Sequence, residues 1–152
     1  MEKSIITLDE RTDPATKQML QKVVEKKQKY ETLKFRHLLV MWATVFSSFF
    51  YFYYLYKVII TPYSYSFSSM FSAYVDHSVN FYALAFIVGC YGFMNLLKEK
   101  RDKAEKEYHA LRCEIIDKSK DLWKKEDAWN NRHLVFEMMK ENFDINLFHE
   151  NK

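Results

Sequence analysis

The stretch that decides the fold runs from Leu38 to Leu97 and reads LLVMWATVFSSFFYFYYLYKVIITPYSYSFSSMFSAYVDHSVNFYALAFIVGCYGFMNLL. Its first segment, residues 38–56, holds 19 residues without a charged side chain, and its second, residues 78–97, holds 20. A helix rises about 1.5 Å per residue, so about 20 residues cross a hydrocarbon core of ~30 Å. We therefore predict two transmembrane helices. Two buried helices of a soluble domain are disfavoured, because the flanks offer too little apolar surface to cover them.

Aromatic side chains mark both ends of the first apolar segment. Trp42 lies near its start, and a Tyr- and Phe-rich run, residues 49–56, occupies its far end before Lys57. Tyr and Trp rings favour the headgroup level of a bilayer, and a lysine at a helix end extends its charge to the interface. This pattern indicates an aromatic girdle rather than a ligand-binding box.

The charges are distributed asymmetrically along a chain whose net charge is only +3. Residues 1–37 hold 9 Lys or Arg and 6 acids, residues 98–152 hold 13 of each, and the 60 residues between them hold one Lys and one Asp. Short loops rich in Lys and Arg stay on the cytoplasmic side. We therefore predict a two-span protein of the cell membrane with both termini in the cytoplasm. The first 37 residues lack an apolar signal-peptide core, so the first span is expected to act as an uncleaved insertion signal.

The hydrophilic flanks are patterned as helices. Asp13-Pro14 is a helix-start signal, with Asp as N-cap and Pro in the first turn. Apolar residues then recur at heptad spacing on both sides of the spans, which indicates a helix–helix seam. We predict that the two flanks form an antiparallel cytoplasmic pair; pairing with a second chain is the alternative. The predicted seam consists of Met19, Val23, Tyr30, Leu33, Ala104, Tyr108, Leu111, Ile115, Leu122 and Trp129.

The C-terminal seam is imperfect, because Lys118, Lys125 and Arg132 fall at seam positions. We predict a helix break at residues 129–132 and a shorter helix beyond it. The expected organisation is a flexible tail (1–12), a cytoplasmic helix (13–37), the first span (38–60), an outer connection (61–77), the second span (78–97), a cytoplasmic helix (98–129), and a short helix with a tail (130–152).

The outer connection is expected to begin with a helix break at Thr61-Pro62, because proline lacks a backbone donor and clashes with the preceding turn. The apolar residues among 67–75 recur at helical spacing, which predicts a short helix at the membrane interface. Asp76-His77 would lie at the water-exposed end of this helix; a proton-sensing or ligand-binding pair is the disfavoured alternative.

Small residues within the spans suggest a packing face. Pairs of small residues four positions apart let two helices approach closely in lipid. The simplest use is packing of the two spans on each other, and dimerisation is the alternative. No charged residue lies inside the apolar segments 38–56 and 78–97, which disfavours a transporter or a selective channel. The candidate packing residues are Ala43, Ser47, Ala85, Gly89 and Gly92.

The sequence contains no recognisable catalytic, cofactor or metal motif. Glu105 and His109 share a helix face, but this single pair is a weak metal-ligand pattern. Cys90 and Cys113 are read as a small apolar residue and a surface thiol. Because cations and acids alternate in the flanks, we read them as solvated helix faces or headgroup contacts rather than a nucleic-acid site.

In its size, its apolar pair 38–56 and 78–97, and its charged helical flanks, the chain resembles the YpbF-like proteins, small two-span membrane proteins of bacilli. The resemblance implies a bacterial inner membrane and no catalytic activity. We expect an all-α protein, a two-span transmembrane hairpin with cytoplasmic helical extensions, that is not an enzyme. Its expected role is that of a membrane-anchored adaptor or scaffold with a protein partner; the alternative is a self-assembling homo-oligomer, with pore formation as one use. Trp123, beside the seam, is a candidate anchor for a partner.

Overall fold

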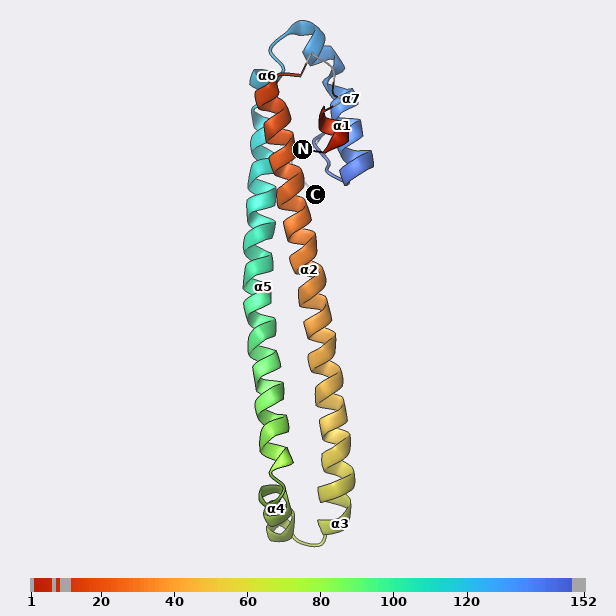
Figure 1. Ribbon diagram of the computed structural model, residues 1–152, viewed down its shortest axis with the longest axis vertical. Coiled ribbons are helices and arrows are strands. Elements are labelled where there is room, and N and C mark those ends of the chain that lie inside the picture. Colours follow the sequence, from red (N-terminus) through yellow and green to blue (C-terminus); the bar gives the residue numbers. More distant parts are fainter. Residues whose placement is uncertain (1, 7, 9–11, 149–152) are drawn as a thin grey trace. The chain divides into compact units, whose positions relative to one another are not determined.

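The computed structural model describes residues 2–6, 8 and 12–148, and every regular element in that part of the chain is a helix, which confirms the all-α class. The chain forms two compact units: a terminal unit of residues 1–32 and 101–152, and a central unit of residues 33–100. The elements, labelled in Figure 1, are α1 (Lys3–Ile6), α2 (Pro14–Leu55), the π-helix η1 (Tyr56–Ile60), α3 (Thr61–Tyr63), α4 (Phe67–Asp76), α5 (Val79–Asp117), α6 (Ser119–Leu122) and α7 (Glu126–Phe143).

Helix α2 begins at the predicted start signal and continues without interruption into the first apolar segment. Pro14 is its first residue, and the carbonyl of Asp13 accepts a hydrogen bond from the Lys17 N–H at 3.0 Å. Proline suits this position, because the first N–H groups of a helix have no intrahelical acceptor. The charged flank and the first apolar segment are thus parts of one helix of 42 residues.

The expected break at Thr61-Pro62 is wrong, because the helical path continues to Tyr63. In a regular helix the proline ring clashes with the carbonyl four residues back. Here the wider π-turn η1 precedes it, and the Thr61 N–H donates to the Tyr56 carbonyl, five residues back. The Thr61 hydroxyl donates to the same carbonyl at 2.8 Å. The wider turn, a π-bulge within the helical path, therefore accommodates Pro62.

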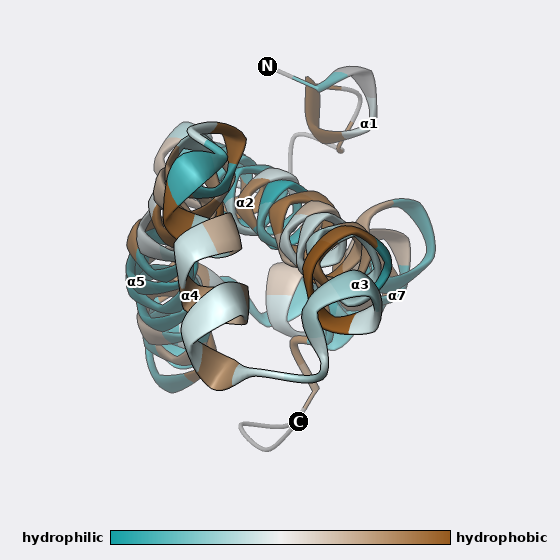
Figure 2. Cartoon of the chain, turned by 90° about the horizontal axis from the view of Figure 1, so that it is seen from below, coloured by the Kyte–Doolittle hydropathy of each residue, from teal (hydrophilic) through white to brown (hydrophobic). Residues whose placement is uncertain are grey.

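The central unit exposes most of its apolar side chains. The helices Pro14–Tyr63 and Val79–Asp117 are long and apolar enough to cross a membrane by length and composition. In the most apolar window of the first, 0% of the residues are buried, and in that of the second 6%. A core helix of a soluble domain would be mostly buried, so these helices do not fit that class. Figure 2 shows hydrophobic positions on the outer surfaces of α2 and α5, and the most exposed include Phe49, Phe50, Phe52, Tyr82, Phe86 and Val88.

A small polar cluster lies between α2, α4 and the start of α5. The Tyr51 hydroxyl donates to the Tyr74 hydroxyl at 3.3 Å, and the side-chain amide of the fully buried Asn80 donates to the Tyr74 carbonyl at 2.8 Å. Helix α4 covers the residues predicted to form a short helix in the connection. Asp76, the last residue of α4, is exposed, and the Nδ1 of His77, which follows it, lies 2.8 Å from the Ala73 carbonyl.

Most of the candidate small residues in the apolar helices are exposed in the described part of the chain. Ala43, Ala85, Gly89 and Gly92 are exposed, and Ser47 is half-buried. A Cβ added at either glycine would meet nothing within 4 Å. The use of these residues in packing, between the two spans or between chains, remains a prediction.

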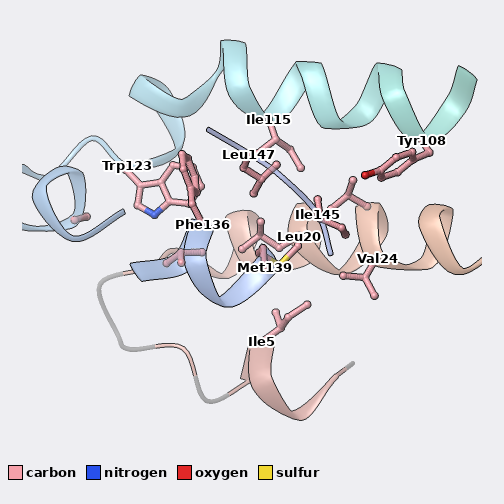
Figure 3. Packing of buried hydrophobic residues seen from close by; sticks show 13 residues of the cluster. Ile5, Leu20, Val24, Tyr108, Ile115, Trp123, Phe136, Met139, Ile145 and Leu147 are labelled. Atoms are coloured by element: carbon pink, nitrogen blue, oxygen red, sulfur yellow. The ribbon is translucent and has the colours of Figure 1, made fainter. Parts of the chain in front are cut away.

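The terminal unit is a helical bundle with a continuous apolar core (Figure 3). Its interior combines two adjacent stripes of α2, one stripe of α5, residues of α7, and short segments near both ends of the chain. Ile5 of α1 lies in the predicted flexible tail 1–12 but is fully buried. Residues 1, 7 and 9–11 of that tail, and residues 149–152, lie outside the described residues. The core residues are Ile5, Leu20, Val23, Val24, Tyr108, Ile115, Trp123, Ala128, Val135, Phe136, Met139, Ile145 and Leu147.

The C-terminal helix breaks earlier than predicted, between Asp117 and Glu126 rather than at residues 129–132. Trp123 leaves helical geometry and is buried at 2% exposure, with its ring edge-on to Phe136 at 5.5 Å between centroids. Glu126 and Asp127 then occupy the first turn of α7, where acidic side chains favour a helix start. Burial of Trp123 and this start signal outweigh the helix-disfavouring pair Asn130-Asn131, which sits inside α7.

Candidate interaction surface

Within the terminal unit, α2 and α5 run antiparallel. The hydroxyl of Thr16, early in α2, donates to the carbonyl of Leu122 at 3.3 Å, in α6 just after the end of α5, whereas Tyr30, later in α2, stacks on Tyr108 of α5. The two tyrosine rings are nearly parallel, with an interplanar angle of 4° and centroids 6.4 Å apart. Increasing residue numbers on one helix therefore meet decreasing numbers on the other.

A salt bridge and a buried arginine add polar contacts to this helix pair. Lys26 Nζ lies 2.6 Å from Glu107 Oε2, and the hydrogen bond and charge of Lys26 hold the pKa of Glu107 below its usual value. Burial raises the pKa of the Tyr108 hydroxyl, an effect opposed by the charge of Arg112 and its hydrogen bond. Because Arg112 is only 4% exposed, this cation is held inside the bundle beside Tyr108.

The structure brings most of the predicted seam residues together in the terminal unit. Val23, Ala104, Tyr108 and Ile115 are buried. Met19, Leu111, Leu122 and Trp129 are partly buried and pack against the same core. Tyr30 is half-buried in its stack, and Leu33 is half-buried in the central unit. The seven-residue recurrence beyond Ile115 does not follow one helix, because α5 ends at Asp117.

Helix α2 carries a second buried stripe that was not predicted from the sequence. Thr16, Leu20 and Val24 follow one another at intervals of four residues, and all three are at most 1% exposed. Leu20 and Val24 belong to the same core as residues of α7 and of the segment after it, which were predicted as a separate short helix and tail. The signal was present in the width of the stripe: a helix that contacts two neighbours needs more apolar positions per turn than a two-helix seam.

Lys27 fixes the C-terminal end of α7 onto α2. Its ammonium group donates to the Phe143 carbonyl at 2.8 Å, to the Asp144 carbonyl, and to Asp144 Oδ2 at 2.9 Å. Asp144 adopts a left-handed conformation, with φ of 53°, which ends the helix and turns the chain. The turn directs the fully buried Ile145 into the core. Lys27 also holds the pKa of Asp144 below its usual value.

One face of the α2–α5 pair is left open as a groove of about 680 Å³. The residues that line it on α2 lie on the opposite side of that helix from the stripe that packs against α7, as the 3.6-residue period requires. Ala110 and the partly buried Leu111 form the apolar part of the lining. Charged residues of both signs surround it: Lys22, Glu25, Lys26, Lys29, Glu107 and Glu114.

The other residues considered as ligands do not converge. His109 Nε2 lies 3.9 Å from Glu105 Oε1, and in the described part of the chain no group of three or more His, Cys, Asp or Glu side chains is placed to hold a metal ion. Cys90 and Cys113 are both free and half-buried. Trp123, the candidate partner anchor, is instead part of the core.

The helical bundle, together with two long helices of exposed apolar surface, places the chain in the all-α class. Within that class, the chain belongs to the family described as proteins of unknown function DUF2663, whose model matches residues 19–150. It is 37% identical over 145 residues to the uncharacterized protein YpbF of Bacillus subtilis (strain 168), covering 95% of each chain. The predicted YpbF-like family is thereby confirmed. No solved structure matches.

Proposed function

We propose that the protein is a non-enzymatic membrane adaptor, anchored by two spans, that docks a helix of a protein partner on its terminal unit. The groove along Leu111 carries this proposal, because α7 already covers the neighbouring face of the bundle and leaves this one open. An apolar strip between charged walls is the form of surface on which an amphipathic helix docks. The mixed charges of the walls provide partners for charges flanking the apolar face of such a helix.

The membrane placement is supported by the exposure of the apolar windows of α2 and α5. Exposure of this apolar surface to water would cost roughly 25 cal/mol per Å² of apolar area. We therefore propose that residues 38–60 and 78–97 cross the cell membrane, that both termini lie in the cytoplasm, and that α4 lies at the outer interface.

This topology predicts the behaviour of reporter fusions in cells. Fusions at Met1 and Lys152 should give cytoplasmic signals, whereas a fusion at Ser68 should give an external one, because Lys and Arg are concentrated on the two flanks. Paired alkaline phosphatase and green fluorescent protein fusions measure this directly. A cytoplasmic signal at Ser68 would contradict the topology.

The docking surface predicts position-specific crosslinking in membranes. A photo-crosslinking residue at Leu111 should capture a distinct protein, whereas the same residue at Leu134, an exposed position of α7, should not. In a second variant, Glu107→Lys should weaken the capture from position 111, because it reverses a charge in the groove wall and breaks the ion pair with Lys26. Equal capture from both positions would contradict a partner site in the groove.

Self-assembly is the second candidate, and the open space around Gly89 and Gly92 favours it. Small exposed residues on a membrane helix allow the close approach of a helix from another copy. Under this alternative, the crosslinking experiment would yield only products of the chain with itself. A homo-oligomer would then replace the adaptor as the functional form, with pore formation as one of its uses.

A further inference from the structure

The formal charges of the central unit are concentrated at one end of each apolar helix. The unit holds five cations and two acids, and four of the cations lie within its first four or last three residues. The opposite end of each apolar helix lies near only one cation, Lys57, and one acid, Asp76. The charged residues of the unit are Lys34, Arg36, Lys57, Asp76, Lys98, Glu99 and Lys100.

The ends that carry the cations also carry exposed apolar side chains on the same helix faces. Lys100 shares one face of α5 with Leu96 and Phe93, which are 57% and 53% exposed. On α2, Arg36 lies one turn before Leu39, which is 53% exposed. Each long cationic side chain can therefore lie with its stem beside apolar surface and its charged group beyond it.

Three of the four cations at these ends form no ion pair with another described residue. Arg36, Lys98 and Lys100 are exposed, and the ion pairs formed among the described residues include none of the three. A guanidinium or ammonium group at this position is free to bind an oxyanion, and Arg pairs with phosphate in a bidentate manner. The apolar side chains beside these groups match the acyl chains that a free phosphate ion lacks.

We propose that Arg36, Lys98 and Lys100, which we call the basic band, bind the headgroups of anionic phospholipids and select them over zwitterionic ones. The proposal rests on the membrane placement proposed above. Each Lys or Arg near an anionic bilayer surface adds attraction that a neutral bilayer does not supply. The band therefore does more than orient the chain: it fixes the lipid class that surrounds this end of the spans.

Lipid analysis of the reconstituted full-length protein tests the proposal. The protein is inserted into vesicles of phosphatidylcholine mixed with phosphatidylglycerol, extracted in mild detergent, and its bound lipids are quantified by mass spectrometry. The bound fraction should be enriched in phosphatidylglycerol. Each neutralised cation of the band should lower the preference for phosphatidylglycerol over phosphatidylcholine by roughly fivefold. The test variant is Arg36→Gln/Lys98→Gln/Lys100→Gln, and Lys57→Gln is the matched control at the opposite end.

The outcomes separate this proposal from the membrane placement itself. Bound lipid at the input ratio for the parent, or equal enrichment in the parent and the triple variant, overturns lipid selection. Loss of enrichment when inorganic phosphate is added at low ionic strength overturns the assignment to lipid headgroups. Release of the parent protein from the vesicles by alkaline carbonate overturns the membrane placement. Enrichment that survives Lys57→Gln and is lost in the triple variant supports the basic band.

Discussion

Replacing Ile115 by alanine should destabilise the terminal unit by roughly 2–5 kcal/mol, the usual cost of deleting a large buried aliphatic side chain. Ile115 is 0% exposed and lies where α5 meets the second stripe of α2 and the segment after α7. The bundle cannot close the resulting cavity without moving three packed segments at once, which favours a cost within this range rather than below it. Pulse proteolysis across a urea series measures the change in the free energy of unfolding.

Leu134→Ala is the matched control, because Leu134 is 55% exposed and loses little burial on truncation. Its effect should remain within about 0.5 kcal/mol, as for most surface substitutions. Under the proposed membrane placement, retention of the variant in the membrane fraction would show that the effect is confined to the terminal unit. Equal losses for the two variants would show that the core of the terminal unit is not centred on Ile115.

The sequence was sufficient to predict features that depend on residues close together along one helix. The start of α2 at Pro14 and the helix α4 are local in this sense, because capping and helical periodicity act within one or two turns. Tyr30 and Tyr108, which stack on each other, were both predicted as seam residues. That prediction used heptad spacing within each of the two flanks, which is also a local pattern.

Features that depend on a third segment were not predictable in the same way. Leu20 and Val24 are buried only because α7 folds back onto α2, and nothing within α2 specifies that partner. The early break before α7 has the same origin, since burial of Trp123 against Phe136 competes with helix propensity at Asn130-Asn131. Pro62 is the opposite case. The expectation that proline ends a helix is a local rule, and it fails here because the π-turn η1 just before Pro62 lets the helical path continue.

The groove could not be predicted from the sequence, because it is defined by the face that α7 leaves uncovered. Leu111 was predicted as a seam residue, and it does pack against the core, but its position at the edge of that core makes it part of the open lining. A seam residue and a docking residue have the same sequence pattern. They differ only in whether a third helix covers them.

Replacing Lys27 by methionine should release the end of α7 at a cost of roughly 1.5–3 kcal/mol, the range for hydrogen bonds to charged groups. The side chain is 12% exposed, and its ammonium group donates to the last carbonyls of α7, which have no partner inside the helix. Methionine keeps the apolar stem and removes only the charge and the donors. The same pulse proteolysis measures the loss, with cleavage after α7 as its most sensitive site.

Acid titration separates the ion pair from the carbonyl contacts. Lys27 lowers the pKa of Asp144 from its ordinary 3.8, so the pair contributes stability above that pH and loses it as the pH falls through the lowered value. Below about pH 4 the parent should therefore lose stability that Lys27→Met has already lost. Asp144→Asn is the control, because asparagine also tolerates the left-handed conformation and leaves the carbonyl contacts in place. Additive effects in the double variant would show that Lys27 and Asp144 act independently, whereas coupling is expected for residues in direct contact.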